Sequence, residues 1–202
     1  MNLVFDLDGT LICSKRRLYE LFCDLSERND LTFSKYWDLK FAGRSNQDIL
    51  KDNFGCVELV VEEFVNNWMK MIENDHYLQM DTLIDGVASF LENVSRAHSL
   101  YICTARQSAS QVTKQLARLS ILNFFESVLV TEQKYTKTEL LKGSGISFSK
   151  DDWMIGDTGH DILTGKEIGV KTCAVSSGFM SKEKLLSYAP DLISDSVSSI
   201  KI

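Results

Sequence analysis

The chain has 202 residues, of which 44% are hydrophobic and 25% are charged, and its formal net charge is −6. This length is typical of one core domain with a sizeable insertion, and the composition is that of a soluble globular protein. The negative charge argues against a nucleic-acid partner, because phosphate backbones are bound by clustered lysine and arginine. No segment has the roughly 18 unbroken apolar residues of a membrane span, so no membrane partner is expected.

The N-terminus leads directly from Met1 into an apolar segment at 3–5, without the charged start and cleavage site of a signal peptide. The five cysteines are scattered singly, with no Cys-x-x-Cys pair. We therefore expect a cytoplasmic protein with reduced thiols and no zinc site. The only basic cluster, Lys15-Arg16-Arg17, is interpreted as the solvated first turn of a helix.

Short apolar runs predict a series of buried strands. They are Leu3 to Phe5, Leu100 to Cys103, Val128 to Val130, Trp153 to Ile155 and Cys173 to Val175, with a short last strand at 191–193. Helix-like stretches lie between the later runs, and this alternation predicts a parallel sheet. Ligands collect at the carboxyl ends of the strands in such a sheet.

Between the first strand and Asp81 the pattern is helical only, with candidate helices at 18–25, 48–54 and 57–72. This stretch is interpreted as an inserted helical module. The predicted fold is therefore α/β, with a Rossmann-like three-layer core around a central parallel sheet and an inserted α-helical cap domain. The core would comprise 1–14 and 82–202 and the cap 15–81, with hinges near 13–17 and 80–85.

Two carboxylates, Asp6 and Asp8, follow the first predicted strand directly. Two like charges close together favour a cation between them or a proton on one of them. Both conditions suit phosphoryl transfer assisted by Mg²⁺, in which one carboxylate attacks phosphorus and the other gives a proton to the leaving oxygen. Gly9 permits the sharp turn that exposes both groups. The alternative is an ordinary Asx-type turn after a strand.

A second acidic pair, Asp157 and Asp161, follows the predicted strand at 153–155. Carboxylate oxygens are ligands that Mg²⁺ prefers, so the pair predicts metal ligands at the same edge of the sheet. Asp161 also suits the N-cap of a helix at 162–168, which is compatible with a role at the site.

Two further elements complete the candidate site. Thr104 ends a predicted strand, where its hydroxyl and neighbouring backbone N–H groups can bind a phosphate oxygen, although it also suits the cap of the helix at 108–119. A lysine is needed to neutralise the nucleophile and the transferring phosphoryl group. Lys137, at the start of a predicted helix, is preferred, and Lys134 is the alternative.

In this order the four elements resemble the motifs of the haloacid dehalogenase superfamily. The resemblance runs from Met1 to about Phe179, and the helical insertion is similar to the first cap type, as in the phosphoglycolate phosphatase and β-phosphoglucomutase branch. One departure is that neither candidate lysine precedes a proline, whereas many relatives carry Lys-Pro there. The dehalogenase branch lacks the second aspartate, so Asp8 indicates phosphorus chemistry.

The resemblance implies an aspartyl-phosphate on Asp6, with Asp8 as the acid and base, and Thr104 and Lys137 as the other catalytic residues. It implies Mg²⁺ as the cofactor, and the residues assigned to the metal are Asp6, Asp8 through its backbone carbonyl, Asp157 and Asp161. The residues next to the first carboxylates and to Thr104 are assigned to the substrate, namely Gly9, Thr10, Ala105 and Arg106.

Within the helical insertion, Phe41-Ala42-Gly43-Arg44-Ser45 resembles a substrate-contacting loop of this branch. Arg44 is therefore a candidate for binding a carboxylate or a second phosphate of the substrate. The equal alternative is a loop between helices in which Ser45 or Asn46 caps the next helix.

The function expected from these features is Mg²⁺-dependent hydrolysis of a small phosphorylated metabolite, similar to phosphoglycolate or a sugar phosphate. A phosphomutase and a catalytically idle module that binds phosphorylated ligands are the alternatives. The expected partner is a small phosphorylated molecule, with no nucleic acid and no membrane, and both a monomer and a homodimer are compatible with the sequence. The substrate itself is decided by the cap.

Overall fold

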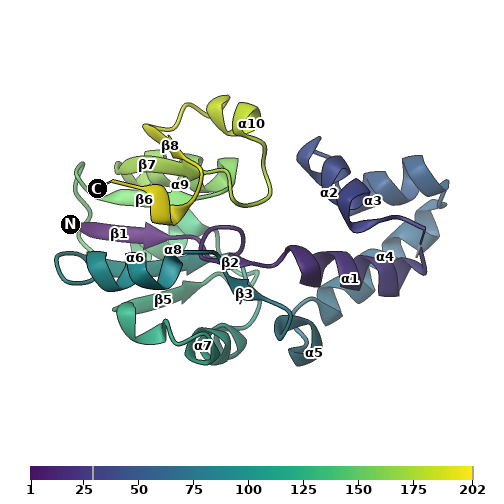
Figure 1. Cartoon of the computed structure of the whole chain (residues 1–202), viewed down its shortest axis with the longest axis horizontal. Coiled ribbons are helices and arrows are strands. Elements are labelled where there is room, and N and C mark those ends of the chain that lie inside the picture. The colour runs from purple at the N-terminus through teal and green to yellow at the C-terminus, as the bar shows by residue number, and fades with distance from the viewer. Residues whose placement is uncertain (29, 202) are drawn as a thin grey trace. The chain divides into compact units, whose positions relative to one another are not determined.

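A six-stranded parallel sheet forms the centre of the larger unit (Figure 1). The computed structural model describes residues 1–28 and 30–201. The strands are β1 (Asn2–Phe5), β4 (Ser99–Thr104), β5 (Ser127–Val130), β6 (Trp153–Gly156), β7 (Lys171–Val175) and β8 (Leu192–Ser194). Their order is β5-β4-β1-β6-β7-β8. Every strand that the apolar runs predicted is therefore present, and the predicted α/β fold with a central parallel sheet is confirmed.

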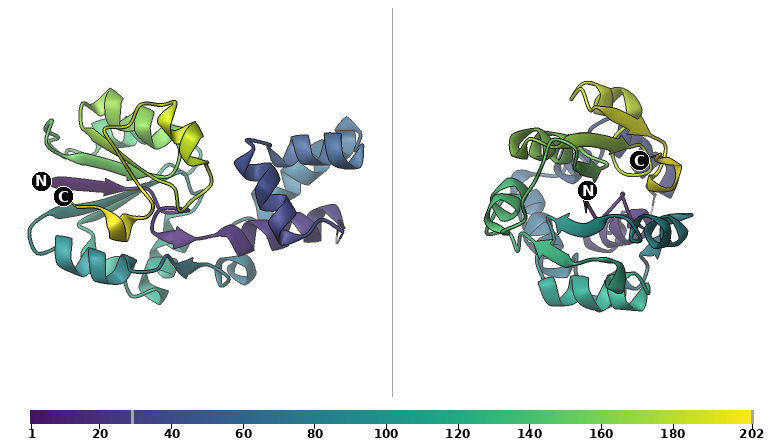
Figure 2. Two further views of the ribbon diagram at one scale, coloured as in Figure 1. Left: turned by 45° about the horizontal axis from the view of Figure 1, so that its top comes forward. Right: turned by 90° about the vertical axis from the view of Figure 1, so that its left-hand side faces the viewer.

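Helices lie against both faces of this sheet (Figure 2). They are α6 (Val87–Val94), α7 (Ala109–Arg118), α8 (Lys137–Gly143), α9 (Gly159–Ile168) and α10 (Lys182–Leu186), with two short 3₁₀ turns, η2 (Leu122–Phe124) and η3 (Val197–Ser199). Because side chains alternate along a strand, β1 contributes to two cores. Leu3 and Phe5 pack with residues of α6 and α7, whereas Val4 packs with Leu141 of α8.

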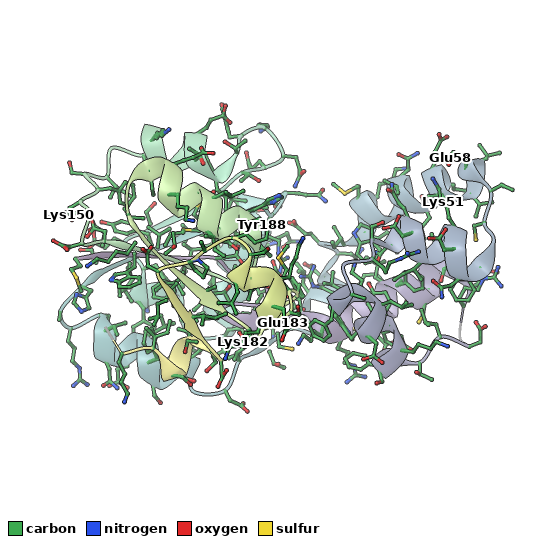
Figure 3. The ribbon with its side chains drawn as sticks, turned by 90° about the horizontal axis from the view of Figure 1, so that it is seen from above. Lys51, Glu58, Lys150, Lys182, Glu183 and Tyr188 are labelled. Atoms are coloured by element: carbon green, nitrogen blue, oxygen red, sulfur yellow. The ribbon has the colours of Figure 1, made fainter. Side chains whose placement is uncertain are left out.

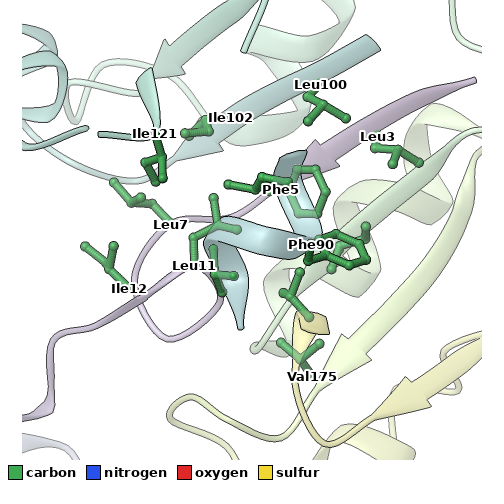
Figure 4. Packing of buried hydrophobic residues seen from close by; sticks show 14 of the residues in the cluster. Leu3, Phe5, Leu7, Leu11, Ile12, Phe90, Leu100, Ile102, Ile121 and Val175 are labelled. Carbon is green, nitrogen blue, oxygen red and sulfur yellow. The ribbon is translucent and has the colours of Figure 1, made fainter. Parts of the chain in front are cut away.

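The loop after β1 belongs to the larger of these cores. Phe5 is fully buried and makes an edge contact with Phe90, with ring centroids 6.2 Å apart. Leu7 and Leu11 are also fully buried in the same cluster (Figure 4). The apolar side chain of Leu7 therefore anchors the segment that carries the two carboxylates on either side of it.

Residues Ser14–Asp81 form a second compact unit, and the described residues of 1–13 and 82–202 form the first. The elements of the second unit, called the helical unit below, are α1 (Lys15–Ser26), α2 (Phe33–Phe41), α3 (Asn46–Asp48), the π-helical turn η1 (Ile49–Asn53), α4 (Glu58–Met71) and α5 (Asp75–Leu78). Phe22 of α1 packs against the rings of Tyr36 and Phe64, so α1, α2 and α4 share one apolar centre. At the surface, Lys51 and Glu58 form an ion pair of 2.6 Å (Figure 3).

Several short elements were not predicted. A two-stranded antiparallel sheet pairs β2 (Ile12–Cys13), just before the helical unit, with β3 (Thr82–Leu83), just after it, and each strand has only two residues. Such strands are too short to produce a readable alternation of apolar and polar residues. The helices α2 and α5 were missed for a related reason, because aromatic and charged residues are mixed along them without a clear helical stripe.

The interpretation of Arg17 as part of a solvated turn is wrong. Arg17 is only 1% exposed, its Nε donates to Asp81 Oδ1 at 3.0 Å, and its Nη1 donates to the carbonyl of Ile72 at 2.8 Å. A run of three basic residues does not reveal which of them lies on the buried face of a helix. Arg17, the third residue of the run, lies on that face, where the carboxylate of Asp81, far along the chain but adjacent in the fold, compensates its charge.

No helix in the described ranges combines the length and the apolar character that crossing a membrane requires.

Candidate active site

The site is built where three neighbouring strands end. β1 lies between β4 and β6, and Phe5 pairs with both Ile102 and Ile155. Asp6 continues the sheet by one residue, because its N–H donates to the carbonyl of Ile155 at 2.9 Å. The residues just beyond the three strands therefore meet at one edge, at the point where the chain order reverses from one side of the sheet to the other.

Lys137 connects two carboxylates from different elements. Its ammonium lies 2.5 Å from Asp6 Oδ1 and 2.6 Å from Asp161 Oδ1, and all three side chains are at most 10% exposed. Lys137 begins α8, whose N-cap Thr136 forms a capping box with Glu139. The other candidate, Lys134, is exposed and pairs with Glu132. Of the two lysines that the sequence left open, the structure thus brings Lys137 to the carboxylates.

Asp161 has a second function in the fold. Its Oδ2 accepts hydrogen bonds from the N–H and the hydroxyl of Thr158, at 3.1 and 2.7 Å, which caps the start of α9. Its Oδ1 faces Lys137. Asp161 is therefore not the N-cap that the sequence suggested, because α9 begins at Gly159 with Thr158 as its N-cap, and Asp161 is the third residue of the helix in a capping box. The capping box and the contact with Lys137 use different oxygens of this carboxylate.

Asp157 is fully buried and held from several sides. The hydroxyl of Thr10 donates to its Oδ1 at 3.1 Å, and the N–H of Phe179 donates to its Oδ2 at 2.8 Å. Gly9, with φ of +85°, and Gly178 pass so close that an added Cβ would lie 2.5 and 1.9 Å from Asp157 Oδ2. Only glycine fits at these two positions while Asp157 stays where it is.

Burial and mutual repulsion disfavour the ionised carboxylates. Burial raises the pKa of Asp6 to about 6, although Lys137 acts in the opposite direction, and Asp161 adds to the rise. Burial and the nearby Asp6 and Asp161 raise the pKa of Asp157 well above its usual range. Burial alone would lower the pKa of Lys137, but Asp161 and Asp6 reverse this effect and raise it. The lysine therefore stays charged, while the acidic cluster has more negative charge than one ammonium neutralises.

This imbalance fits a bound divalent cation. Asp6, Asp157 and Asp161 each offer an oxygen, and these oxygens lie within 4.8 Å of one another. When all three are ionised, the ammonium of Lys137 neutralises one of the three charges, and the raised pKa values of Asp6 and Asp157 reflect the cost of keeping the other two buried without a cation. Hard oxygen ligands and an uncompensated double negative charge are the properties of a Mg²⁺ site.

The carboxylate of Asp8 is engaged differently from that of Asp6. Arg106 Nη2 donates to Asp8 Oδ1 at 2.8 Å, and Arg106 Nε donates to Asp8 Oδ2. The guanidinium is 6% exposed. Arg106 was expected to contact the substrate, and the structure brings it to Asp8. Any contribution of Asp8 to a metal is left to its backbone carbonyl.

The remaining candidate residues divide between the two units. Thr104 is 2% exposed at the end of β4, and the exposed Ala105 follows it, so both lie at the same edge as Asp6. Arg44 lies in the helical unit, where it pairs with Asp52. Ser45 forms a capping box with Asp48 at the start of α3, as in the structural alternative for this loop.

Sequence reasoning missed three groups around the site. The N–H of Phe179 binds Asp157, the hydroxyl of Ser177 donates to the carbonyl of Gly9 at 2.9 Å, and Gln115 of α7 accepts from Arg106 at 3.2 Å. The Ser-Ser-Gly turn after the strand at 173–175 was the available signal for the first two. No local pattern pointed to Gln115, because its partner is brought to it only by the packing of α7.

The larger unit contains a cavity of about 580 Å³. Its lining includes Ala105 and Lys137 together with Thr131, Gln133, Tyr135 and Thr164. Two of the candidate site residues therefore border a cavity within the core unit.

Comparison with known proteins identifies the family. The family model of haloacid dehalogenase-like hydrolases matches residues 3–175. Pyrophosphatase PpaX of Bacillus cereus strain Q1 is 29% identical in an alignment that covers 98% of this chain and 94% of that protein. The chain therefore belongs to the haloacid dehalogenase-like hydrolase family, and the predicted family and class of enzyme, a hydrolase, are confirmed.

Solved structures agree on the fold. A haloacid dehalogenase-like hydrolase from Streptococcus pneumoniae superposes with a TM-score of 0.78 at 23% identity, covering 97% of this chain and 94% of that one. YfnB of Bacillus subtilis, solved bound to magnesium, superposes with a TM-score of 0.63 at 20% identity, covering 96% and 94%. At these identities the likeness shows that the fold is shared along nearly the whole chain.

Proposed function

We propose that this chain is a Mg²⁺-dependent phosphatase that hydrolyses small phosphorylated metabolites through a phosphoryl group carried on Asp6. The observation that carries the proposal is the buried arrangement of Asp6, Asp157 and Asp161 around Lys137 at the edge of the parallel sheet. A structural ion-pair network would balance its charges, whereas this cluster keeps an excess that suits a cation and a phosphoryl group. The pyrophosphatase named among the relatives supports chemistry at phosphorus.

In the first half of the reaction, a carboxylate oxygen of Asp6 attacks the phosphorus atom. The bond between phosphorus and the ester oxygen breaks, and Asp8 gives its proton to the leaving alcohol. Lys137 orients Asp6, from whose Oδ1 it is 2.5 Å away, and its charge stabilises the negative charge on the transferring group. Thr104 and the backbone N–H groups after it bind the phosphoryl oxygens.

In the second half, a water molecule attacks the phosphorus of the aspartyl-phosphate and passes a proton to Asp8. The bond between phosphorus and the Asp6 oxygen breaks, which releases inorganic phosphate and restores the Asp6 carboxylate and the protonated Asp8. The metal would be held by Asp6, Asp157 and the backbone carbonyl of Asp8, and Asp161 would support it and anchor Lys137. When bound, Mg²⁺ supplies charge stabilisation for the transferring phosphoryl group.

A substrate panel tests this proposal. Phosphoglycolate, sugar phosphates, nucleotides and pyrophosphate are compared by kcat/KM for phosphate release, with Mg²⁺ and with a chelator. We expect phosphate release that requires Mg²⁺ and is lost in Asp6→Asn. Release that survives Asp6→Asn would contradict the mechanism. Isomerised sugar phosphate without free phosphate would identify a phosphomutase, and binding without turnover of any substrate would identify a binding module.

A further inference from the structure

Arg106 has no role in the mechanism above, although it makes a two-point contact with the carboxylate of Asp8. Its guanidinium addresses both oxygens of Asp8, with Nη2 at 2.8 Å from Oδ1 and Nε on Oδ2. A planar guanidinium matches a carboxylate in this two-point geometry, which fixes the rotation of the carboxyl group as well as its position.

Arg106 is itself held in place. Its carbonyl accepts from the N–H of Glu132 at 3.0 Å and from the hydroxyl of Thr131 at 3.4 Å. At the other end, its Nη2 also donates to Gln115 Oε1 at 3.2 Å. Arg106 and Gln115 are 6% and 4% exposed, so the contacts lie in a shielded part of the core unit. A series of contacts therefore runs from α7 through Arg106 to the carboxylate of Asp8.

We propose that Arg106, oriented by Gln115, is a positioning residue that sets the location of the Asp8 carboxyl for proton transfer to the leaving group, holding one oxygen while the other carries the proton. The inference rests on the proposed function, in which Asp8 is the acid and base. It differs from the expectation that Arg106 binds the substrate, because the guanidinium edge formed by Nε and Nη2 is directed at Asp8.

The two roles for Arg106 predict different dependence on the leaving group. Every phosphate ester transfers the same phosphoryl group, so a residue that binds this group affects all esters alike. A residue that positions the acid matters only when the leaving oxygen needs a proton. p-Nitrophenyl phosphate has a good leaving group that departs as an anion, whereas phosphoglycolate releases a poor one. The ratio kcat/KM includes steps up to departure of the leaving group, so it reports this difference directly.

The test compares wild type, Arg106→Lys and Asp8→Asn on both esters. Lysine keeps the positive charge but cannot make the two-point contact. We expect Arg106→Lys to lower kcat/KM for phosphoglycolate by roughly 10- to 100-fold and for p-nitrophenyl phosphate by less than about 3-fold. Asp8→Asn should show the same pattern with a larger loss. Arg96→Lys is the matched control, because Arg96 forms an exposed ion pair with Glu92 and should leave both values unchanged.

Two further measurements make the result decisive. If Arg106 acts through Asp8, Arg106→Lys should add little to the loss already caused by Asp8→Asn, which a double-mutant cycle measures. Gln115→Leu should reproduce the leaving-group pattern with a smaller loss, and it serves as the second variant if Arg106→Lys does not fold.

Equal losses for both esters, or additive losses in the cycle, would overturn the inference. If Asp6→Asn abolishes turnover and Asp8→Asn shows the leaving-group pattern while the Arg106 and Gln115 variants do not, only this inference fails. If Asp6→Asn retains activity, the proposed function fails, and the inference fails with it.

Discussion

Two buried charge clusters, one in each unit, show how differently this fold uses buried charge. In the helical unit, Arg17 pairs with Asp81 at 3.0 Å and both side chains are at most 2% exposed, so one positive charge faces one negative charge in this pair. In the core unit, oxygens of three carboxylates lie within 4.8 Å of one another, and Lys137 pairs with two of these carboxylates, Asp6 and Asp161. A neutral buried pair is understood as part of the structure, whereas an unbalanced one is costly to maintain without a ligand. This difference supports the core unit as the place of the proposed reaction.

The largest effect that separates the two clusters is expected for Asp6→Asn. This change keeps the shape of the side chain but removes the nucleophile, so phosphate release should fall on the order of 10⁴-fold or more. Its thermal stability in the presence of a chelator should not fall, because one of several repelling charges is removed. Steady-state kinetics and thermal unfolding of the same preparation check both results. A clear loss of stability would mean that the cluster is structural.

Arg17→Met should have the opposite profile. It leaves Asp81 buried without its guanidinium, and the free energy of unfolding should fall by about 3–5 kcal/mol. Exchange of both partners, Arg17→Met with Asp81→Leu, should recover most of the loss, because no buried charge then remains. Urea denaturation provides the measurement. The neighbouring Arg16→Met is the control, since Arg16 makes only an exposed pair with Glu20 and should change stability by about 1 kcal/mol or less.

The next largest expected effect is that of Mg²⁺ on thermal stability, which should depend on the cluster in the core unit and not on the Arg17–Asp81 pair. Mg²⁺ in excess over its dissociation constant should raise the melting temperature of the wild type, because it binds the folded state. In Asp157→Asn the increase of the melting temperature with Mg²⁺ should shrink or disappear. Arg17→Met should have a lower melting temperature but the same increase with Mg²⁺. Thermal unfolding at a series of Mg²⁺ concentrations measures this increase. An equal response in Asp157→Asn would assign the metal to other residues.

The smallest expected effect is a pH dependence in the absence of metal. The pKa of Asp6 is raised from 3.8 to about 6, so between these values the folded state binds more protons than the unfolded state at this group. Linkage then makes the Asp6 contribution to stability increase as the pH falls from about 7 towards 4. The difference in unfolding free energy between wild type and Asp6→Asn, measured across this range with a chelator present, isolates the contribution. A difference that is flat or increases with pH would contradict the assignment.

Most of the sheet and part of the site could be predicted from the sequence, for identifiable physical reasons. Buried parallel strands are nearly continuous apolar runs, so the strands at 3–5, 100–103 and 153–155 can be recognised directly in the amino-acid sequence. Residues that follow such runs must meet at one edge of the sheet. Asp6, Thr104 and Asp157 could therefore be grouped from the sequence alone.

The contacts that orient these residues could not be predicted. The choice between Lys134 and Lys137 depends on where α8 begins and how it packs, and both lysines follow the same strand. Arg17 meets a partner that lies far away in the sequence, and Gln115 meets Arg106 across the turn before α7, so in both cases only the packing of the folded chain brings the side chains together. Local patterns determine the edge at which side chains gather, and packing determines which pairs touch.

The most direct test of the central claim is to trap the phosphoryl group. The enzyme turning over p-nitrophenyl phosphate with Mg²⁺ is quenched in acid, digested and mapped by peptide mass spectrometry. The account predicts one phosphoryl group on the peptide that contains Asp6. This adduct should be more abundant in Asp8→Asn, in which water attack is slowed, and absent in Asp6→Asn. A phosphoryl group on another residue, or phosphate release at an undiminished rate in Asp6→Asn, would contradict the account.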